Sequence, residues 1–355
     1  MTARAAFALP GDIATLTGGY IYDRRLVGSL RDLGCDVDLI SLPASLPTPD
    51  AADMRKALDQ LAALPADVPV IIDGLAFGAL ETAGLHRVMA PIVAMIHHPL
   101  AQESALPADL ADHLWRTERA NLTLARHVMV PSPHTRDMLI TRYDVPPEKI
   151  TVVRPGTDRP AAPQAPVDPP LILSVGILHP RKGHDVLVEA LAQLADLDWE
   201  AVIAGNPWDD RHVAALHGQV AQSGLGKRLE LAGRVTPERL SQLYRQASVF
   251  ALATRYEGYG IVFDEALSHG LPIVSTRTGA VVDTVPADAG LLVPVDDPEA
   301  LAAALRRLLT DPQERTVRAA AAARAGAALP RWSDAGTTAM AVLDALPPAA
   351  LASTP

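Results

Sequence analysis

The stretch SVFALATRYEGYGIVFDEALSHGLPIVST, residues 248–276, contains an apolar segment, a glycine-containing loop, a helical segment and a second apolar segment. SVFALAT and LPIVST are predicted to be strands, and IVFDEALSHG between them is predicted to be a helix. A strand, a helix and a further strand in succession form a βαβ unit, in which both strands lie parallel in one sheet. The stretch therefore predicts a parallel sheet covered by helices.

The same alternation of strands and helices extends over both halves of the chain. It runs from AAFALP to KITVVRPG in the first half and restarts at LILSVG in the second. The proline-rich segment of residues 155–170 has no periodicity and is predicted to link the halves. We predict the α/β class, with two Rossmann-like, doubly wound parallel-sheet domains at residues 1–160 and 161–330 facing a central cleft. Residues 347–355 are predicted to form a flexible tail.

The composition fits an enzyme-sized globular protein and argues against other classes. The chain has 355 residues, of which 49% are hydrophobic and 20% charged, and its net charge is −10. This charge argues against a nucleic-acid-binding protein, because phosphate backbones attract basic surfaces. The single cysteine, Cys35, excludes an intrachain disulfide and fits a reducing compartment. With no signal peptide or membrane span in the sequence, we expect a cytoplasmic protein whose membrane contact is at most peripheral, at the inner face.

Two glutamates flank the glycines of residues 248–276. Glu257 follows a predicted strand, at the carboxyl edge of the sheet where α/β proteins bind ligands. Gly258 and Gly260 allow the backbone to approach a ligand closely, and the start of the next helix favours an anion. Glu265 would repel a phosphate but can accept two hydrogen bonds from a vicinal diol such as a ribose. Acidic residues in a first helical turn also stabilise a helix without a ligand, so the spacing alone leaves a structural role open.

Two cations occupy the equivalent place after an earlier strand. In VGILHPRKGHDVLVEAL, residues 175–191, a strand is predicted to end at Gly176, and a short loop carries Arg181 and Lys182 to the next helix. Two cations at a carboxyl edge suggest recognition of a diphosphate. The alternative is a solvated basic pair, which is the weaker reading because cations are unfavourable at a helix N-terminus.

These motifs resemble those of the retaining GT-B glycosyltransferases of the family 4 type. EGYGIVFDEALSHGLPIVST resembles the E-x7-E motif of the family, VGILHPRKGHDVLVEAL its phosphate-binding segment, and LAGRVTPERLSQLYRQASVFALAT the helix and strand before the motif. The resemblance is strong over residues 150–330 and weaker before them, where TGGYIYDRRLVGSLRDLG and IHHP carry it. It implies a GT-B fold in which the C-terminal domain mainly binds a nucleotide-sugar donor and the N-terminal domain mainly binds the acceptor. It also implies that a final helix, at residues 331–346, crosses back onto the N-terminal domain.

In the second half, the resemblance implies a role for each motif residue. Glu265 is expected to hold the donor ribose, and Lys182, helped by Arg181, to neutralise the departing diphosphate. Glu257 and the amides around Tyr259 are expected to line the donor-sugar site. The expected donor-binding residues are Gly18, Gly19, Arg181, Lys182, Glu257, Gly258, Tyr259, Gly260 and Glu265.

In the first half, Gly18 and Gly19 match a glycine loop of the family that closes over the donor phosphates. His97 matches a histidine at a strand end near the transferred sugar. The resemblance therefore implies His97, Glu257 and Lys182 as the catalytic residues.

The sequence departs from the family pattern at two positions. His98 stands where relatives often carry an acidic residue, and Ile177 stands where many carry an arginine, whose place Arg181 is expected to take. We expect no metal and no cofactor beyond the nucleotide sugar as co-substrate. The acidic pairs at residues 208–210 and 295–297 are interpreted as helix caps rather than metal ligands.

The function expected from the resemblance is a retaining transfer of a hexosyl group from a nucleoside-diphosphate sugar to an acceptor hydroxyl. The protein would contribute positioning and charge stabilisation of the leaving diphosphate. The alternatives are another GT-B nucleotide-sugar enzyme, such as an epimerase, and a non-catalytic nucleotide-sugar-binding protein. The sequence leaves open the donor base and sugar, the oligomeric state and the acceptor, which can be a saccharide, a lipid-linked saccharide or a small metabolite.

Overall fold

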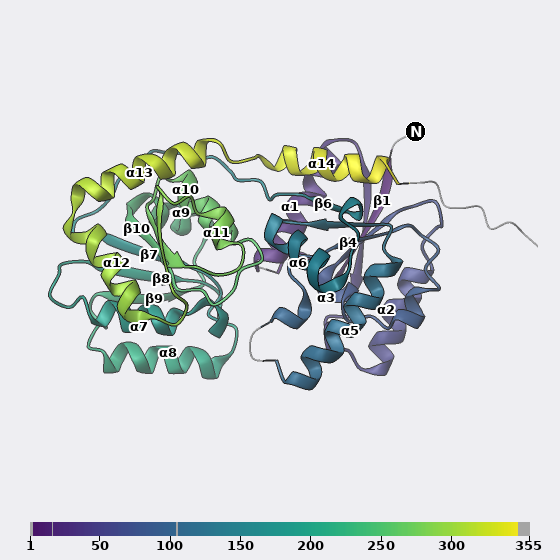
Figure 1. Cartoon of the computed structure of the whole chain (residues 1–355), viewed down its shortest axis with the longest axis horizontal. Helices are drawn as coiled ribbons and strands as arrows, with labels where there is room; N and C mark the ends of the chain where they lie inside the picture. The colour runs from purple at the N-terminus through teal and green to yellow at the C-terminus, as the bar shows by residue number, and fades with distance from the viewer. Residues whose placement is uncertain (1–2, 16, 104–105, 347–355) are drawn as a thin grey trace, which may run out of the picture. The chain divides into compact units, whose positions relative to one another are not determined.

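The chain divides into two compact α/β units (Figure 1). The structure is a computed structural model, and it describes residues 3–15, 17–103 and 106–346. The first unit comprises Met1–Gly156 and Pro330–Pro355, and the second comprises Thr157–Leu329. The tail predicted at residues 347–355 lies outside the described residues. No helix in the described ranges is long and apolar enough to cross a membrane.

The first unit is built on six parallel strands in the order β2-β1-β3-β4-β5-β6. These strands are β1 (Arg4–Pro10), β2 (Asp36–Leu42), β3 (Val70–Asp73), β4 (Ile92–Met95), β5 (His127–Val130) and β6 (Ile150–Val152). The helical segments between them are α1 (Gly18–Asp32), α2 (Ala51–Ala62), α3 (Gly74–Phe77), α4 (Thr82–Leu85), η1 (Leu100–Gln102), α5 (Ala108–Leu124), α6 (Pro133–Tyr143) and η2 (Pro147–Lys149). Every residue of β3 and β4 is buried, as in parallel strands that are covered on both faces.

The second unit repeats this architecture with the strand order β12-β11-β10-β7-β8-β9, again all parallel. Its strands are β7 (Leu171–Val175), β8 (Glu200–Ala204), β9 (Leu229–Gly233), β10 (Ala247–Leu252), β11 (Ile273–Thr276) and β12 (Gly290–Val293). Its helical segments are η3 (Pro180–Lys182), α7 (His184–Ala192), α8 (Asp210–Gln222), α9 (Pro237–Gln246), α10 (Ile261–Ser268), α11 (Val281–Thr284), α12 (Pro298–Thr310) and α13 (Pro312–Ala327). In β10, Val249 and Ala251 belong to one hydrophobic core and Phe250 and Leu252 to another, so cores lie on both faces of the sheet. The doubly wound architecture predicted from the alternation is confirmed for both units.

The helix α14 (Trp332–Asp344) belongs to the first unit, where it packs against α1 (Figure 1, yellow). The two helices approach closely at Gly336, where a Cβ atom would lie only 2.7 Å from the Cβ of Ser29. Trp332 adds an edge-to-face contact with Tyr22 of α1, with ring centroids 5.6 Å apart. Both contacts fix α14 against the same helix.

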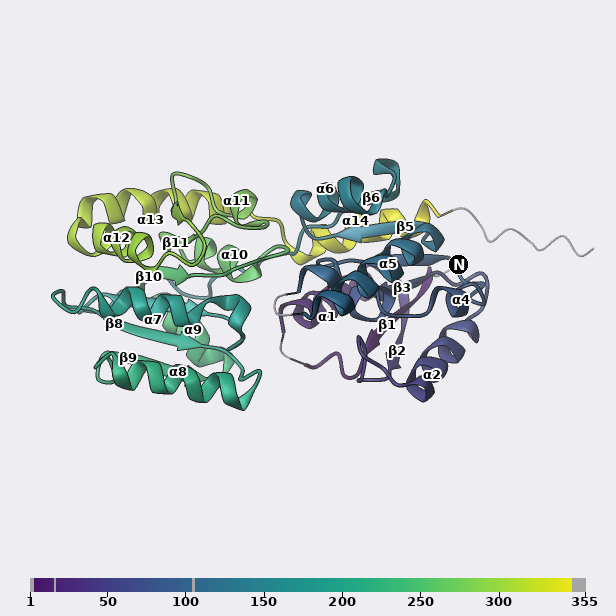
Figure 2. The same cartoon turned by 60° about the horizontal axis from the view of Figure 1, so that its bottom comes forward.

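The helix α13 is absent from the sequence prediction. Its sequence, PQERTVRAAAAARAGA, is rich in alanine, so the apolar periodicity that identifies an amphipathic helix is faint. The Asp311 side chain caps the helix by accepting from the amide of Glu314 at 2.9 Å. The buried residues Ala321, Ala322 and Gly326 are small, which suits close packing on α10. Figure 2 shows α13 beside α12, with which it is also in contact.

The prediction of a glycine loop at Gly18 and Gly19 is wrong. Both residues form the first turn of α1, which begins at Gly18. Thr17 is the N-cap, and its side chain accepts from the amide of Tyr20 at 3.5 Å. A threonine followed by an amphipathic segment is a common helix start, so the cap outweighs the low helix propensity of two glycines.

Candidate functional site

The cations and the glutamate of the second unit meet at the carboxyl edge of its sheet. The strands β7 and β10 are parallel neighbours, so the loops that follow them begin side by side. The amide of Arg255, in the loop after β10, donates to the carbonyl of Arg181 in η3 at 2.7 Å. The sheet order therefore joins two motifs that are far apart in the sequence.

Lys182 and Glu257 form a buried ion pair at this edge. The Nζ atom of Lys182 lies 2.6 Å from Oε1 of Glu257, and both side chains are almost completely buried. Nη1 of Arg181 lies 3.8 Å from Oε2 of the same carboxylate and donates to the carbonyl of Tyr256 at 3.0 Å. The hydroxyl of Thr254 also donates to Oε1 of Glu257, at 3.0 Å. We call Arg181, Lys182 and Glu257 the cation cluster.

The ionised form of Glu257 is favoured in this cluster. Burial raises the pKa of Glu257, but the charges of Lys182 and Arg181 and the hydrogen bonds from Lys182 and Thr254 outweigh it, so the pKa lies below its ordinary value. With two cations and one carboxylate, the cluster carries a net charge of about +1. A buried positive charge at a carboxyl edge suits a phosphate-bearing ligand.

Arg255 holds the two loops in place. Its guanidinium donates to both carboxylate oxygens of Asp185, at 3.0 and 2.8 Å, and to Asp296 at 2.7 Å. It also donates to the carbonyl of Pro180, next to the cation cluster. Sequence reasoning missed Arg255, although it directly precedes Tyr256 and Glu257 in the motif. Its position in the sequence suggests a third phosphate-binding cation, whereas its contacts are those of a clamp between loops.

Two glycines are required by the backbone around the cation cluster. Gly183 has a φ of +63°, and a Cβ there would overlap the carbonyl of Ala253. Gly279 has a φ of +50°, and a Cβ there would overlap the carbonyl of Glu257. Both positions combine a left-handed conformation with a close approach, which only glycine tolerates.

The Gly258–Tyr259–Gly260 segment leads into α10. Gly260, with a φ of +87°, is the N-cap residue of the helix. The ring of Tyr259 is buried, and its hydroxyl donates to Asp264 within the unit. The side chain of Tyr259 therefore packs within the unit, so a ligand at this residue would be bound by the backbone.

Glu265 lies one turn into α10 and pairs with a tyrosine. Its Oε2 accepts a hydrogen bond from the hydroxyl of Tyr244 at 2.7 Å. Burial raises the pKa of Glu265, the hydrogen bond from Tyr244 opposes that shift, and the charge of Asp158 adds to it. The carboxylate keeps further acceptor capacity, because each of its oxygens can accept more than one hydrogen bond.

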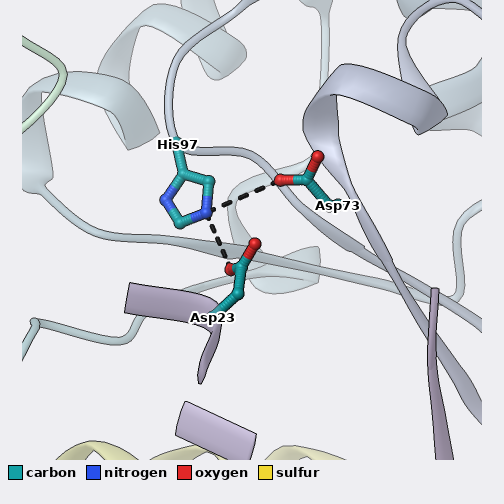
Figure 3. Close-up of side chains that lie close together, drawn as sticks. All are labelled: Asp23, Asp73 and His97. Carbon is teal, nitrogen blue, oxygen red and sulfur yellow. Dashed lines mark hydrogen bonds and ion pairs between the residues drawn. The ribbon is translucent and has the colours of Figure 1, made fainter. Parts of the chain in front are cut away.

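In the first unit, His97 lies between two buried carboxylates, as Figure 3 shows. The Nε2 atom of His97 is 2.9 Å from Oδ1 of Asp23 on α1 and 3.7 Å from Oδ2 of Asp73 at the end of β3. The other carboxylate oxygen of Asp73, Oδ1, accepts from the amide of Leu75 at 3.0 Å and so caps α3. We call Asp23, Asp73 and His97 the acidic triad.

Gly19, in the first turn of α1, lies beside this triad. A Cβ at Gly19 would lie 3.4 Å from Cδ2 of His97, so the imidazole packs in van der Waals contact with the start of α1. The ring of Tyr22 meets His97 edge-to-face at 5.0 Å. His98, the next residue, turns to Glu103, with its Nε2 3.2 Å from the carboxylate. The described geometry thus separates the roles of the two neighbouring histidines.

Sequence reasoning missed Asp23 and Asp73. From the sequence alone, Asp23 is an ordinary polar residue of an amphipathic helix. Asp73 carries a weak signal, because it ends the apolar run VIID at the carboxyl edge of a predicted strand. The neighbouring order of β1, β3 and β4, which brings them to His97, cannot be read from one sequence.

Two features bear on metal binding: the spacing of the acidic triad in the first unit, and the contacts of the two acidic pairs in the second unit. The donor atoms of the triad lie within 4.8 Å of one another, a spacing that a cation site also requires. The contact between Nε2 and Asp23 is satisfied without a metal when the imidazole donates through Nε2, because a carboxylate oxygen accepts. One residue of each acidic pair is a helix cap, as predicted: Asp209 accepts from the amide of His212, and Asp297 accepts from the amide of Ala300.

Two α/β units with doubly wound parallel sheets are the architecture of the GT-B proteins. Residues 157–325 match the family described as glycosyl transferases group 1, and residues 18–159 match the family described as Glycosyltransferase Family 4. The chain belongs to these family 4 glycosyltransferases.

Individual relatives agree with this assignment. The D-inositol 3-phosphate glycosyltransferase of Corynebacterium efficiens is 32% identical over 197 residues, which cover 50% of this chain and 46% of the relative. The chain thus spans about half the length of the curated relatives that it matches.

Among solved structures, sucrose-phosphate synthase from Thermosynechococcus elongatus matches with a TM-score of 0.80 and 22% identity, over 96% of this chain and 98% of that one. The Anabaena protein HepE in complex with UDP-glucose matches with a TM-score of 0.76 and 16% identity, over 96% of this chain and 100% of that one. At these identities the structures establish the shared fold.

Proposed function

We propose that this protein is a retaining glycosyltransferase that moves a hexosyl group from a nucleoside-diphosphate sugar to an acceptor hydroxyl. The bond between the anomeric carbon and the diphosphate oxygen breaks, and the acceptor oxygen forms its bond on the same face. The proton of the acceptor hydroxyl passes to an oxygen of the leaving diphosphate. The proposed reaction needs no resident metal or cofactor.

The observation that carries this proposal is the cation cluster. Arg181 and Lys182 are held at the carboxyl edge by a carboxylate that neutralises only one of them. Fixed cations in a buried site stabilise charge that develops on a leaving group, because they need no reorganisation during the reaction. The clamp made by Arg255 keeps both loops rigid, which such a preorganised site requires.

Glu265 is proposed to hold the donor ribose. It lies in the same motif as Glu257, one turn into the helix that begins at the carboxyl edge. The hydroxyl of Tyr244 orients its carboxylate, and the remaining acceptor positions suit the two hydroxyls of a ribose. His97 and the backbone around Gly258 and Tyr259 are proposed to contact the transferred sugar.

The relatives suggest the first substrates to test. HepE was solved with UDP and with UDP-glucose, which makes a uridine diphosphate sugar the first candidate donor. Several curated relatives are named for D-inositol 3-phosphate, which makes an inositol phosphate the first candidate acceptor.

The donor site can be tested by the thermal shift that UDP, GDP, ADP and their sugar conjugates each produce. The variants are Lys182→Ala and, as a matched control in the same unit, Lys227→Ala, whose side chain is exposed. We expect one nucleotide to stabilise the wild type and Lys227→Ala. Lys182→Ala should bind it about 10- to 100-fold more weakly, because a hydrogen bond to a charged group contributes about 1.5–3 kcal/mol.

A second comparison separates the two proposed contacts. Glu265→Ala should weaken binding of the nucleotide but leave binding of inorganic diphosphate unchanged, whereas Lys182→Ala should weaken both. Equal binding of all ligands by the wild type and Lys182→Ala would contradict the proposed donor site. Nucleotide binding without release of the diphosphate in the presence of any acceptor would instead favour a non-catalytic binding protein.

A further inference from the structure

In the acidic triad, one side of the His97 imidazole contacts the two carboxylates, and the other side faces away from them. Nε2 of His97 faces the carboxylates of Asp23 and Asp73, and Figure 3 shows the second ring nitrogen, Nδ1, pointing away from both. The side chain of His97 is 18% accessible, whereas those of Asp23 and Asp73 are 1% and 4% accessible. The carboxylates are therefore sealed behind the ring, and the Nδ1 edge is the part of the triad that a ligand can reach.

We propose that Asp23 and Asp73 are positioning residues that hold His97 as an imidazolium, so that its Nδ1–H acts as a charged hydrogen-bond donor to the substrate. A neutral imidazole that donates through Nε2 would present Nδ1 as an acceptor. Protonation reverses that property and makes the exposed edge a cationic donor. The inference rests on the proposed function for the identity of the substrate, but not for the state of His97.

The surroundings of the ring favour the charged form. Burial lowers the pKa of His97, but the charge and hydrogen bond of Asp23 and the charge of Asp73 outweigh it, so the pKa is raised. The pKa of Asp73 is itself raised to about 7, first by burial and then by the charge of Asp23, while His97 lowers it. The titrations of His97 and Asp73 are therefore coupled.

Two tyrosines of α1 lie close to the triad. Tyr20 is close enough to both carboxylates that burial, Asp73 and Asp23 together raise its pKa to about 12. Its hydroxyl donates to the carbonyl of Pro10 at 2.8 Å, and the hydroxyl of Tyr22 donates to the carbonyl of Val153 at 2.7 Å. Tyr20 therefore remains neutral near pH 7, and among the contacts of the described residues His97 is the cationic partner of the carboxylates.

The direct test is the titration of His97 by NMR, observed at the Cε1–H of its imidazole in the protein without ligand. The variant His97→Gln identifies the signal among the 11 histidines of the chain. We expect a midpoint above the ordinary value of about 6.5, and a downward shift of about one unit or more in Asp23→Asn and in Asp73→Asn. The matched control is Asp53→Asn in α2, whose carboxylate pairs with Ser45, and it should leave the midpoint unchanged.

Two results would overturn the proposal. One is a wild-type midpoint at or below the ordinary value, or one that neither substitution moves. The other is a purified protein that retains one equivalent of a divalent cation and in which His97 titrates only after a chelator has removed that cation. If one aspartate variant fails to fold, as judged by circular dichroism, the other still decides the question.

An activity measurement then separates this inference from the proposed function. The rate of transfer should fall at high pH as His97 loses its proton, and this alkaline limb should move to lower pH in Asp23→Asn. We expect kcat to fall about 10- to 100-fold in that variant with a smaller change in KM, since the charged donor acts on the reacting sugar. Absence of transfer with every donor would reject the proposed function, whereas transfer with an unmoved alkaline limb would reject only this inference.

Discussion

The buried ion pair between Lys182 and Glu257 predicts how substitutions of these two residues change the free energy of unfolding. Removing one partner leaves an uncompensated charge in a buried site, so Glu257→Gln should lower the free energy of unfolding by about 3–5 kcal/mol. Replacing both, as in the double variant Lys182→Met with Glu257→Gln, should recover a large part of that loss. Urea unfolding of the wild type, both single variants and the double variant measures the coupling. Strictly additive losses would show that the pair contributes no coupling energy.

At the level of single elements, the turn between β7 and α7 depends on Gly183. An alanine there would have to adopt a positive φ and would overlap the carbonyl of Ala253. We expect Gly183→Ala to destabilise the second unit by about 1–3 kcal/mol and to weaken nucleotide binding, because the turn carries Lys182. The control is Gly226→Ala, whose Cβ would meet no atom within 4 Å and which should be close to neutral. Similar melting temperatures and nucleotide affinities for the two variants would contradict this account.

The elements also show what one sequence can and cannot specify. Alternating apolar and amphipathic segments were sufficient to predict every strand of both sheets, most clearly β3 and β4, which are buried throughout. The helix α13 was not predicted, because its buried face consists of alanine and glycine. The start of α1 was predicted to be a loop, because glycine usually indicates a loop. The residues of the E-x7-E stretch could be identified by resemblance, but the clamp by Arg255 depends on contacts with Asp185 and Asp296 that only the folded chain creates.

For the whole molecule, the buried carboxyl group of Glu118 predicts how stability depends on pH. Burial raises its pKa to about 8, although the amide of Leu100 donates to it at 3.1 Å. Because the folded protein holds this proton and the unfolded chain releases it near pH 4.5, the contribution of Glu118 to stability falls as the pH rises from about 5 to about 8. Glu118→Gln should remove this pH dependence. Over this range its free energy of unfolding should rise relative to that of the wild type by a few kcal/mol, at about 1.4 kcal/mol per pKa unit.

Thermal or urea unfolding at pH 5, 6.5 and 8 measures this difference. Glu81→Gln is the matched control, because Glu81 is exposed and makes no capping hydrogen bond with its side chain. Parallel curves for the wild type and Glu118→Gln would show that Glu118 is ionised in the folded protein at neutral pH.

The central claim, a retaining transfer from a nucleotide sugar, is tested most directly by following the anomeric proton by NMR during turnover. The donor would be the one selected by thermal shift, and D-inositol 3-phosphate the first acceptor. We predict that a nucleoside diphosphate accumulates, that the first product keeps the anomeric configuration of the donor, and that Lys182→Ala is slower by at least about 100-fold while Lys227→Ala is unchanged. A product with the inverted configuration, or transfer that is unaffected by Lys182→Ala, would contradict the account.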